Sequence, residues 1–174
     1  MQEETQKLFD KICDPNEKEA FYFAEKIGKI NTEEVRDKLI KLVKGDNWEI
    51  AYLACKALSK TSFNKESLDA IFEAIRDKKN QNHQGAFVQI LEEFDLSESF
   101  VDIFRIFLFG NFKAETLAKE YLDTVEFEIT PRTIRKAEKH WNHYLHNPED
   151  PGSLQLKKLE VEPILNEMRE LFSE

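Results

Sequence analysis

The stretch "GDNWEIAYLACKALSK" (45–60) decides the fold, because it predicts a helix that is apolar on more than one side. At 100° per residue, its aliphatic and small side chains cover about 200° of arc. These residues are Ile50, Ala51, Leu53, Ala54, Cys55, Ala57 and Leu58. A surface helix buries a single stripe, so this helix needs packing partners on two sides, and its alanines permit close approach. The rest of the chain must supply both partners.

The apolar pattern of this stretch recurs every 32 residues along the chain. The sets that coincide are Leu39, Ile71 and Ile103; Val43, Ile75 and Phe107; Ala54, Ala86 and Ala118; and Leu58, Ile90 and Leu122. An earlier copy, "FYFAEKIGK" (21–29), matches "AYLACKALS" (51–59) at an offset of 30. A fixed period of this length is typical of stacked helix pairs, in which no pair can bury its apolar face alone.

The repeats predict four helix pairs, at about 2–30, 31–62, 63–95 and 96–127, which form a repeat region of 1–127. Thr32, Asn64 and Ser97 each precede a run of helical periodicity and are predicted to cap it. Residues 128–174 are expected to add capping helices to the same globular unit. The expected fold is all-α, a right-handed superhelix of helix pairs known as an α-solenoid.

The C-terminal region predicts helices that can cover the end of the repeats. Residues 131–146 form one amphipathic pattern, which begins at Pro131 after a capping Thr130. "LQLKKLEVE" (154–162) alternates and predicts an extended segment, with Pro163 opening a last helix. The run 97–109 is apolar nearly all round and needs this cover. Alternatively, the last helix docks on a second copy of the chain and makes a homodimer.

The charge balance limits the classes of partner. The formal net charge is −9, and residues 1–127 hold 18 Lys and Arg against 25 Asp and Glu. A nucleic-acid partner is not expected, because a phosphate backbone requires clustered Lys and Arg. The acidity permits a basic protein partner, and it also simply keeps a protein in solution. Without a long apolar run or a secretory signal, we expect a cytoplasmic protein that does not enter a membrane.

The sequence contains no motif that predicts catalysis, a cofactor or a metal. We find no Gly-rich phosphate loop, nucleophile elbow, His-Glu-x-x-His helix or paired Cys motif. His140, His143 and His146 recur every third residue, but each step drifts about 60° around a helix. No carboxylate or Cys completes a ligand set, so a solvated basic face is favoured over a metal site.

The repeat resembles the HEAT family of α-helical repeats. The residues that carry the resemblance are Leu39, Val43, Asp46, Ala54 and Leu58, with their counterparts in later copies. The short period looks most like the HEAT variant of phycobilisome lyases, and the resemblance covers about 1–127. The usual Val-Arg pair early in the second helix is replaced here by Glu49-Ile50. In this family the second helix of each pair usually lines the concave surface, so the resemblance implies a binding surface there.

These second helices carry the predicted partner-binding residues, on the face away from the core. They are Tyr22, Lys26, Trp48, Tyr52, Lys56, Asn80, Gln84 and Phe112. Trp48 and Tyr52 are spaced i, i+4 and should lie side by side. Exposed aromatic residues beside Lys are typical of protein-binding hot spots, although such rings also cover the seams between repeats.

We therefore expect a non-enzymatic scaffold that binds another protein through the concave face. A sharper hypothesis is a bacterial immunity or antitoxin-type protein that masks a basic toxin. The HEAT resemblance also implies an enzymatic alternative. This is either a DNA glycosylase-type repair enzyme, for which Trp48 and Asp46 are present, or a chromophore lyase.

Overall fold

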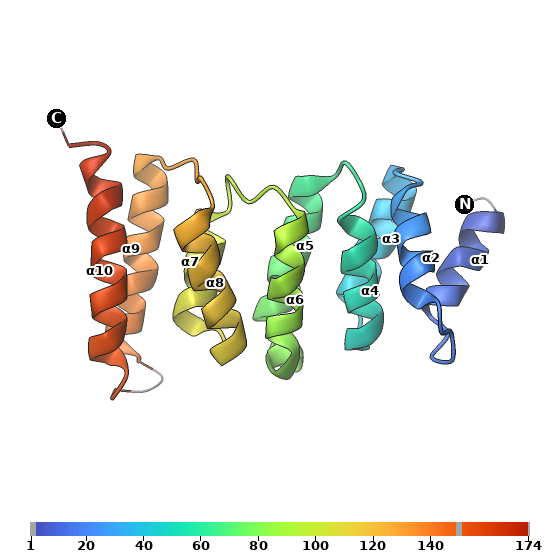
Figure 1. Cartoon of the computed structure of the whole chain (residues 1–174), viewed down its shortest axis with the longest axis horizontal. Helices are drawn as coiled ribbons and strands as arrows, with labels where there is room; N and C mark the ends of the chain where they lie inside the picture. Colours follow the sequence, from blue (N-terminus) through green and yellow to red (C-terminus); the bar gives the residue numbers. More distant parts are fainter. Residues whose placement is uncertain (1–2, 149–150, 174) are drawn as a thin grey trace. The chain divides into compact units, whose positions relative to one another are not determined.

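The computed structural model describes residues 3–148 and 151–173, which form ten α-helices (Figure 1). Two short 3-10 helices, η1 (Lys78–His83) and η2 (Leu91–Glu93), lie on either side of α6 in the sequence. These described ranges contain no β-strand, so the prediction of an all-α fold is confirmed. None of their helices has the length and apolar character that crossing a membrane requires.

The first compact unit ends at Asp95 and consists of three helix pairs. The pairs are α1 (Glu3–Ile12) with α2 (Ala20–Gly28), α3 (Glu33–Val43) with α4 (Trp48–Leu58), and α5 (Asn64–Arg76) with α6 (Gln84–Ile90). Helix α2 packs against α4, and α4 packs against α6, so the second helices form one layer. Helix α4 also packs against α3 and α5. The two-sided burial that "GDNWEIAYLACKALSK" predicts is therefore confirmed.

The core of this unit follows the repeat period. Leu39 and Ile71, which coincide at the 32-residue offset, are both fully buried, and so are Ala54 and Leu58. Gly28 is also buried, at a point where α2 lies close to the backbone of α4. A Cβ atom added at Gly28 would overlap the carbonyl oxygen of Ala57, so only glycine fits there. Small residues therefore allow the close approach of α2 to α4.

Two asparagines join successive repeats through hydrogen bonds. The Asn31 Oδ1 atom accepts from the Ser62 backbone N–H at 2.8 Å, and Asn31 has a left-handed backbone with φ 49°. The Asn64 amide donates to the Asp95 carbonyl oxygen at 2.9 Å, while its Oδ1 accepts from the Asp95 N–H at 3.0 Å. Both side chains bind backbone groups of loop residues, which would otherwise lack partners.

The predicted helix caps are only partly confirmed. Thr32 caps α3, because its Oγ1 accepts from the Val35 N–H at 3.3 Å. The prediction for Asn64 is wrong, since Asn64 is the first helical residue of α5 and its side chain is bound to Asp95. The prediction for Ser97 is also wrong, because the cap position of α7 is Ser99.

The second compact unit begins at Leu96 and contains four helices. They are α7 (Phe100–Phe109), α8 (Phe112–Thr124), α9 (Pro131–His146) and α10 (Leu154–Glu170). Helix α7 packs against both α8 and α9, which supplies the cover that its apolar surface requires. The contacts thus group the fourth predicted pair, 96–127, with the C-terminal helices. The division into 1–127 and 128–174 stays a prediction.

The start of α9 is confirmed, whereas the segment after it is not extended. Thr130 and Thr133 form a reciprocal capping box before α9, with Pro131 in the first turn. By contrast, 154–162 is helical, and Pro163 lies inside α10 rather than opening a helix. Lys157, Val161, Leu165 and Met168 are the buried residues of α10. Their 4-4-3 spacing is helical, and the prediction failed because this buried face begins with a lysine.

Replacing Gly28 with alanine should test the close approach of α2 to α4. We expect Gly28→Ala to lower the free energy of unfolding by about 2 kcal/mol, because the added methyl group meets backbone atoms that cannot move alone. Urea denaturation followed by circular dichroism measures the change. Glu25→Ala, at an exposed position of the same helix, is the control and should change stability by less than about 0.5 kcal/mol. Equal effects of the two substitutions would contradict the prediction.

Candidate functional site

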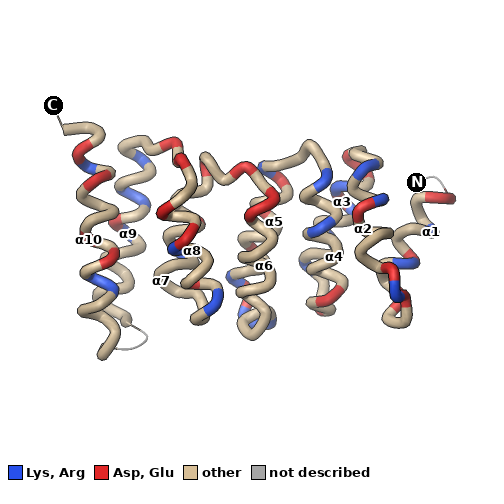
Figure 2. Tube along the Cα trace, in the orientation of Figure 1, with Lys and Arg blue, Asp and Glu red and all other residues tan. Residues whose placement is uncertain are grey.

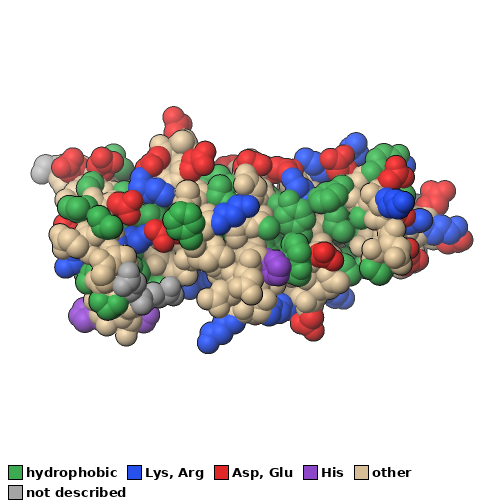
Figure 3. Space-filling view, turned by 60° about the horizontal axis from the view of Figure 1, so that its bottom comes forward, with side chains coloured by type: hydrophobic (Ala, Val, Ile, Leu, Met, Phe, Trp, Pro, Cys, Tyr) green, Lys and Arg blue, Asp and Glu red, His purple; other side chains and the backbone are tan. Residues whose placement is uncertain are grey.

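A groove of about 480 Å³ opens on the first unit, where the loop between α1 and α2 faces α4. Its larger apolar side chains are Ile12, Phe21, Trp48, Ile50, Tyr52 and Leu53. We call this site the aromatic groove. Figure 3 shows hydrophobic side chains gathered on this part of the surface, with a histidine and an acidic side chain beside them. A concave apolar site of this kind is the usual form of a binding site.

Three aromatic rings define the aromatic groove. Trp48 and Tyr52 lie one turn apart on α4, and Phe21 comes from the first turn of α2. The rings of Phe21 and Tyr52 meet edge to face, with centroids 6.1 Å apart. The His83 ring stacks on Trp48 at 3.9 Å, nearly parallel, and so covers one face of the indole. Phe21 is 58% exposed, so the groove presents aromatic surface to solvent.

The charged residues that line the aromatic groove are all acidic. They are Asp14 and Glu17, from the loop between α1 and α2, and Glu49, from the first turn of α4. No Lys or Arg belongs to the lining. Glu17 is paired with Lys11 at 2.8 Å, and the hydrogen bond from Lys11 lowers the pKa of Glu17. Asp14 and Glu49 have exposed side chains at the surface.

The structure brings two of the predicted site residues together in this groove, namely Trp48 and Tyr52. Tyr22 is exposed beside the groove residues on α2, and the Lys26 Nζ atom lies 4.4 Å from the centre of its ring. These two residues therefore form a separate pair on the same helix. Gln84 is half-buried, and its amide donates to the Ile75 carbonyl oxygen at 2.8 Å.

The prediction of a surface role for Asn80 is wrong. Asn80 is 2% exposed, and its Nδ2 atom donates to the Ala74 carbonyl oxygen at 2.9 Å. The residue lies in η1, where the helix between α5 and α6 is tightened into a 3-10 turn. The helical period of the flanking segments does not continue through this turn, so the expected face was misassigned.

Phe112 belongs to the second unit and lines a different hollow. Its side chain is 87% exposed at the start of α8. The hollow has a volume of about 610 Å³ and includes Leu156 and Leu159 of α10. Beneath it, the buried Lys157 forms an ion pair with Glu115. Phe112 is thus exposed as predicted, but it does not share a site with Trp48.

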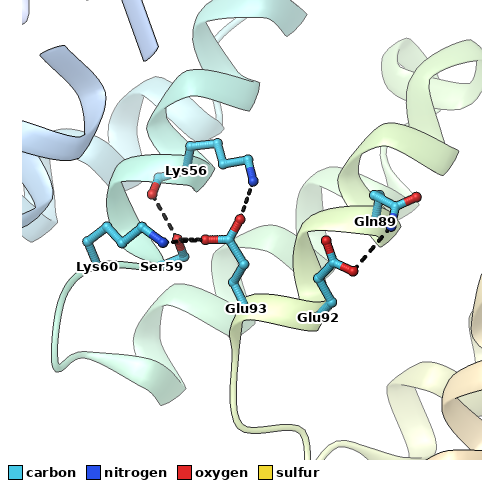
Figure 4. Close-up of polar contacts among 6 residues, drawn as sticks. All are labelled: Lys56, Ser59, Lys60, Gln89, Glu92 and Glu93. Atoms are coloured by element: carbon cyan, nitrogen blue, oxygen red, sulfur yellow. Dashed lines mark hydrogen bonds and ion pairs between the residues drawn. The ribbon is translucent and has the colours of Figure 1, made fainter. Parts of the chain in front are cut away.

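Lys56 is held in an ion-pair cluster rather than left free for a partner (Figure 4). Its ammonium group pairs with Glu93, which also accepts from Lys60 at 2.7 Å and lies 2.7 Å from the Ser59 hydroxyl. Burial raises the pKa of Glu93, but the hydrogen bonds from Lys56, Lys60 and Ser59 outweigh it and lower that pKa to about 2. The cluster joins the C-terminal end of α4 to η2.

Sequence reasoning missed Phe21 and His83, which complete the aromatic groove. Phe21 aligns with Ala51, a buried core position, so the repeat gave no reason to place Phe21 on the surface. The available signal was the run "FYF" (21–23), because three successive rings cannot all face the core. His83 ends η1, and its stacking on Trp48 depends on the shape of that turn.

The histidines of α9 lie in different surroundings. His140 is half-buried, and burial lowers its pKa. His146 bonds through its Nδ1 atom to the Asn142 carbonyl oxygen at 2.7 Å. Within the described residues, no three His, Cys, Asp or Glu side chains are grouped so that they could hold a metal ion.

Comparison with known families finds one match. A family model described as HEAT repeats matches residues 5–92, half of the chain. This segment contains most of α1, all of α2 to α6, and the whole aromatic groove. Neither the curated proteins nor the solved structures give a match.

Glu93 should stabilise the fold in a pH-dependent way. We expect Glu93→Gln to lower the free energy of unfolding by about 2 kcal/mol at pH 7, because the ionised carboxylate is bound by two ammonium groups. Since the pKa is depressed in the folded state, this stabilisation is complete above the unfolded pKa of 4.5. It is lost as the pH falls from there to about 2. Urea denaturation at pH 7, 4 and 3 measures it.

Glu92→Gln is the matched control for this prediction, since Glu92 is the exposed neighbour of Glu93. It should change stability by less than about 0.5 kcal/mol at every pH. A loss from Glu93→Gln that stays constant between pH 7 and 3 would show that the charge of Glu93 is not its cause.

The two cysteines should react very differently. Cys13 is exposed at the edge of the aromatic groove, whereas Cys55 is fully buried and burial strongly raises its pKa. We expect N-ethylmaleimide to modify only Cys13 in the native protein and both cysteines in urea, because the thiolate is the reactive form. Mass spectrometry of the intact chain and its peptides measures this. Native modification of Cys55 at a similar rate would disprove its burial.

Proposed function

The chain belongs to the HEAT-repeat family, and we propose that it is a non-enzymatic scaffold that binds another protein through the aromatic groove. HEAT repeats are generally protein-interaction scaffolds, which gives the class of function. The observation that carries the proposal is the convergence of three rings from two helices, the exposed Phe21 and the half-buried Trp48 and Tyr52, around one concave site. Exposed aromatic side chains that converge on a hollow are the typical anchors of protein interfaces.

The groove is suited to a few side chains of a protein partner. Its volume of about 480 Å³ holds a short segment, and its walls come from α2, α4 and the loop between α1 and α2. These elements are fixed by the close packing of α2 on α4 at Gly28. A rigid site of this kind requires little reorganisation on binding, which favours affinity.

The position of Asp46 does not support the DNA glycosylase-type alternative, which requires a carboxylate in the groove. The Asp46 side chain is 100% exposed and pairs with Lys79 at 3.3 Å. Asp46 is not among the residues of the aromatic groove, although Trp48 is. The lining of the groove is acidic rather than basic, which is unfavourable for a nucleic-acid backbone.

The chemistry of the partner is also part of the proposal. An acidic groove on an acidic chain favours a basic partner, and a basic toxin masked by an immunity or antitoxin-type protein is one example. The cytoplasmic location and the homodimer through the last helix also stay predictions. Leu156, Leu159, Leu171 and Phe172 are exposed on and after α10, which supports an interaction there without identifying the occupant.

Photo-crosslinking from Cys13 can test the proposed function, because this native thiol lies on the groove. The full chain carries benzophenone maleimide on Cys13 and is irradiated in lysate of its native host. We expect a specific protein to be crosslinked and identified by mass spectrometry. The purified partner should then bind wild type at least about tenfold more tightly than a folded Trp48→Ala/Tyr52→Ala variant.

The matched control is a Cys13→Ser/Asp69→Cys variant with the same label. Asp69 is exposed on α5 and does not line the groove. A protein that crosslinks equally from both positions is a non-specific neighbour. If no protein crosslinks to Cys13 above this control, the aromatic groove is not the binding surface.

A further inference from the structure

We propose that the aromatic groove recognises a cationic side chain, Arg or Lys, carried beside an apolar residue in a segment of the partner protein. The inference rests on the proposed function and adds the chemistry that selects the partner. It follows from three properties of the groove: its aromatic lining, its acidic rim and the engagement of Lys11, Lys26 and Lys56 with other residues.

The aromatic surface supplies the first attraction. The His83 ring covers one face of Trp48, while Trp48 still lines the groove. The Phe21 and Tyr52 rings, at right angles to each other, form a second aromatic wall. The negative faces of such rings attract an ammonium or guanidinium group, and most strongly a guanidinium that can also stack.

The carboxylates supply the second attraction, and they come from both walls. Asp14 follows α1, whereas Glu49 lies in the first turn of α4. The Asp14 Oδ1 atom accepts the Asn16 N–H at 2.9 Å, which fixes the carboxylate without neutralising it. Glu17 already pairs with Lys11, so Asp14 and Glu49 are the two groups that a partner cation would meet.

Lys and Arg side chains of the chain itself do not line the groove. Lys11 is bound to Glu17, Lys26 lies over the Tyr22 ring, and Lys56 pairs with Glu93. None of these lysines belongs to the groove lining. The unit therefore provides aromatic faces and negative charge in one hollow, and it leaves the complementary positive charge to the partner.

The apolar part of the groove explains why the cation should stand beside an apolar residue. Ile12, Ile50, Leu53 and Ala86 contribute aliphatic surface next to the rings. Such surface can cover the methylene stem of Lys or Arg and a neighbouring Leu or Val, while the charged head stays at the acidic rim. A small acidic or uncharged polar segment would gain neither contact.

A peptide selection can test the inference on the full chain. A phage library of random 12-residue peptides is selected on wild type and counter-selected on the folded Trp48→Ala/Tyr52→Ala variant. We expect the groove-dependent peptides to carry Arg or Lys at least about twice as often as the unselected library.

Charge is then tested within the best peptides. Replacement of Arg by citrulline, which keeps its shape but not its charge, should weaken binding about tenfold. Binding is read from Trp48 fluorescence in a Trp141→Phe variant, because the chain has only two tryptophans. An Asp14→Asn/Glu49→Gln variant should bind the Arg peptide less tightly and the citrulline peptide equally, and added salt should act in the same direction.

The outcomes separate this inference from the proposed function. Groove-dependent peptides that are neutral or acidic, or that keep their affinity with citrulline, overturn the cation preference and leave a protein-binding groove. The absence of any groove-dependent peptide also overturns it. Only if Cys13 also fails to crosslink a protein does the proposed function fall with it.

Discussion

The close approach of α2 to α4 is the constraint on which the rest of the first unit depends. Gly28 faces the Ala57 carbonyl oxygen near the C-terminal ends of these helices, with no room for a side chain. Ala24 of α2 and Ala54 of α4 are also small and fully buried. Near the N-terminal ends of the same two helices, Phe21 meets Tyr52 edge to face. The two rings of the groove are thus carried by helices that pack closely at their other ends.

The distribution of charge follows from the same stacking. Helices α1 to α5 each carry both basic and acidic side chains (Figure 2). Several of these cations reach the neighbouring repeat, as Lys44 does to Glu73 and Lys56 to Glu93. Such exposed or half-buried pairs contribute modestly to stability. Neither Lys44 nor Lys56 lines the aromatic groove, whose rim carries the acidic Asp14 and Glu49.

The parts of this structure that could be predicted from sequence are those fixed by repeated burial. Leu39 and Ile71 recur because each repeat meets the next in the same way, so the helix pairs and the core were predictable. The features that could not be predicted depend on single contacts that do not repeat along the chain. Lys157 is buried through its pairing with Glu115, which hid the helical period of α10. Asn80 lies in a 3-10 turn, and His83 reaches Trp48 only because of the shape of that turn.

The geometry also separates two explanations for the aromatic residues of the second helices, namely seams between repeats and surfaces for a partner. Trp48 is half-buried and stacks on His83 of the next repeat, so covering a seam accounts for much of its contact. The seam between α2 and α4 is already closed by small residues at Gly28 and Ala57. It does not require Phe21, which remains 58% exposed. Stability alone therefore explains Trp48 better than Phe21, and the exposed ring of Phe21 is the stronger argument for a surface that meets another molecule.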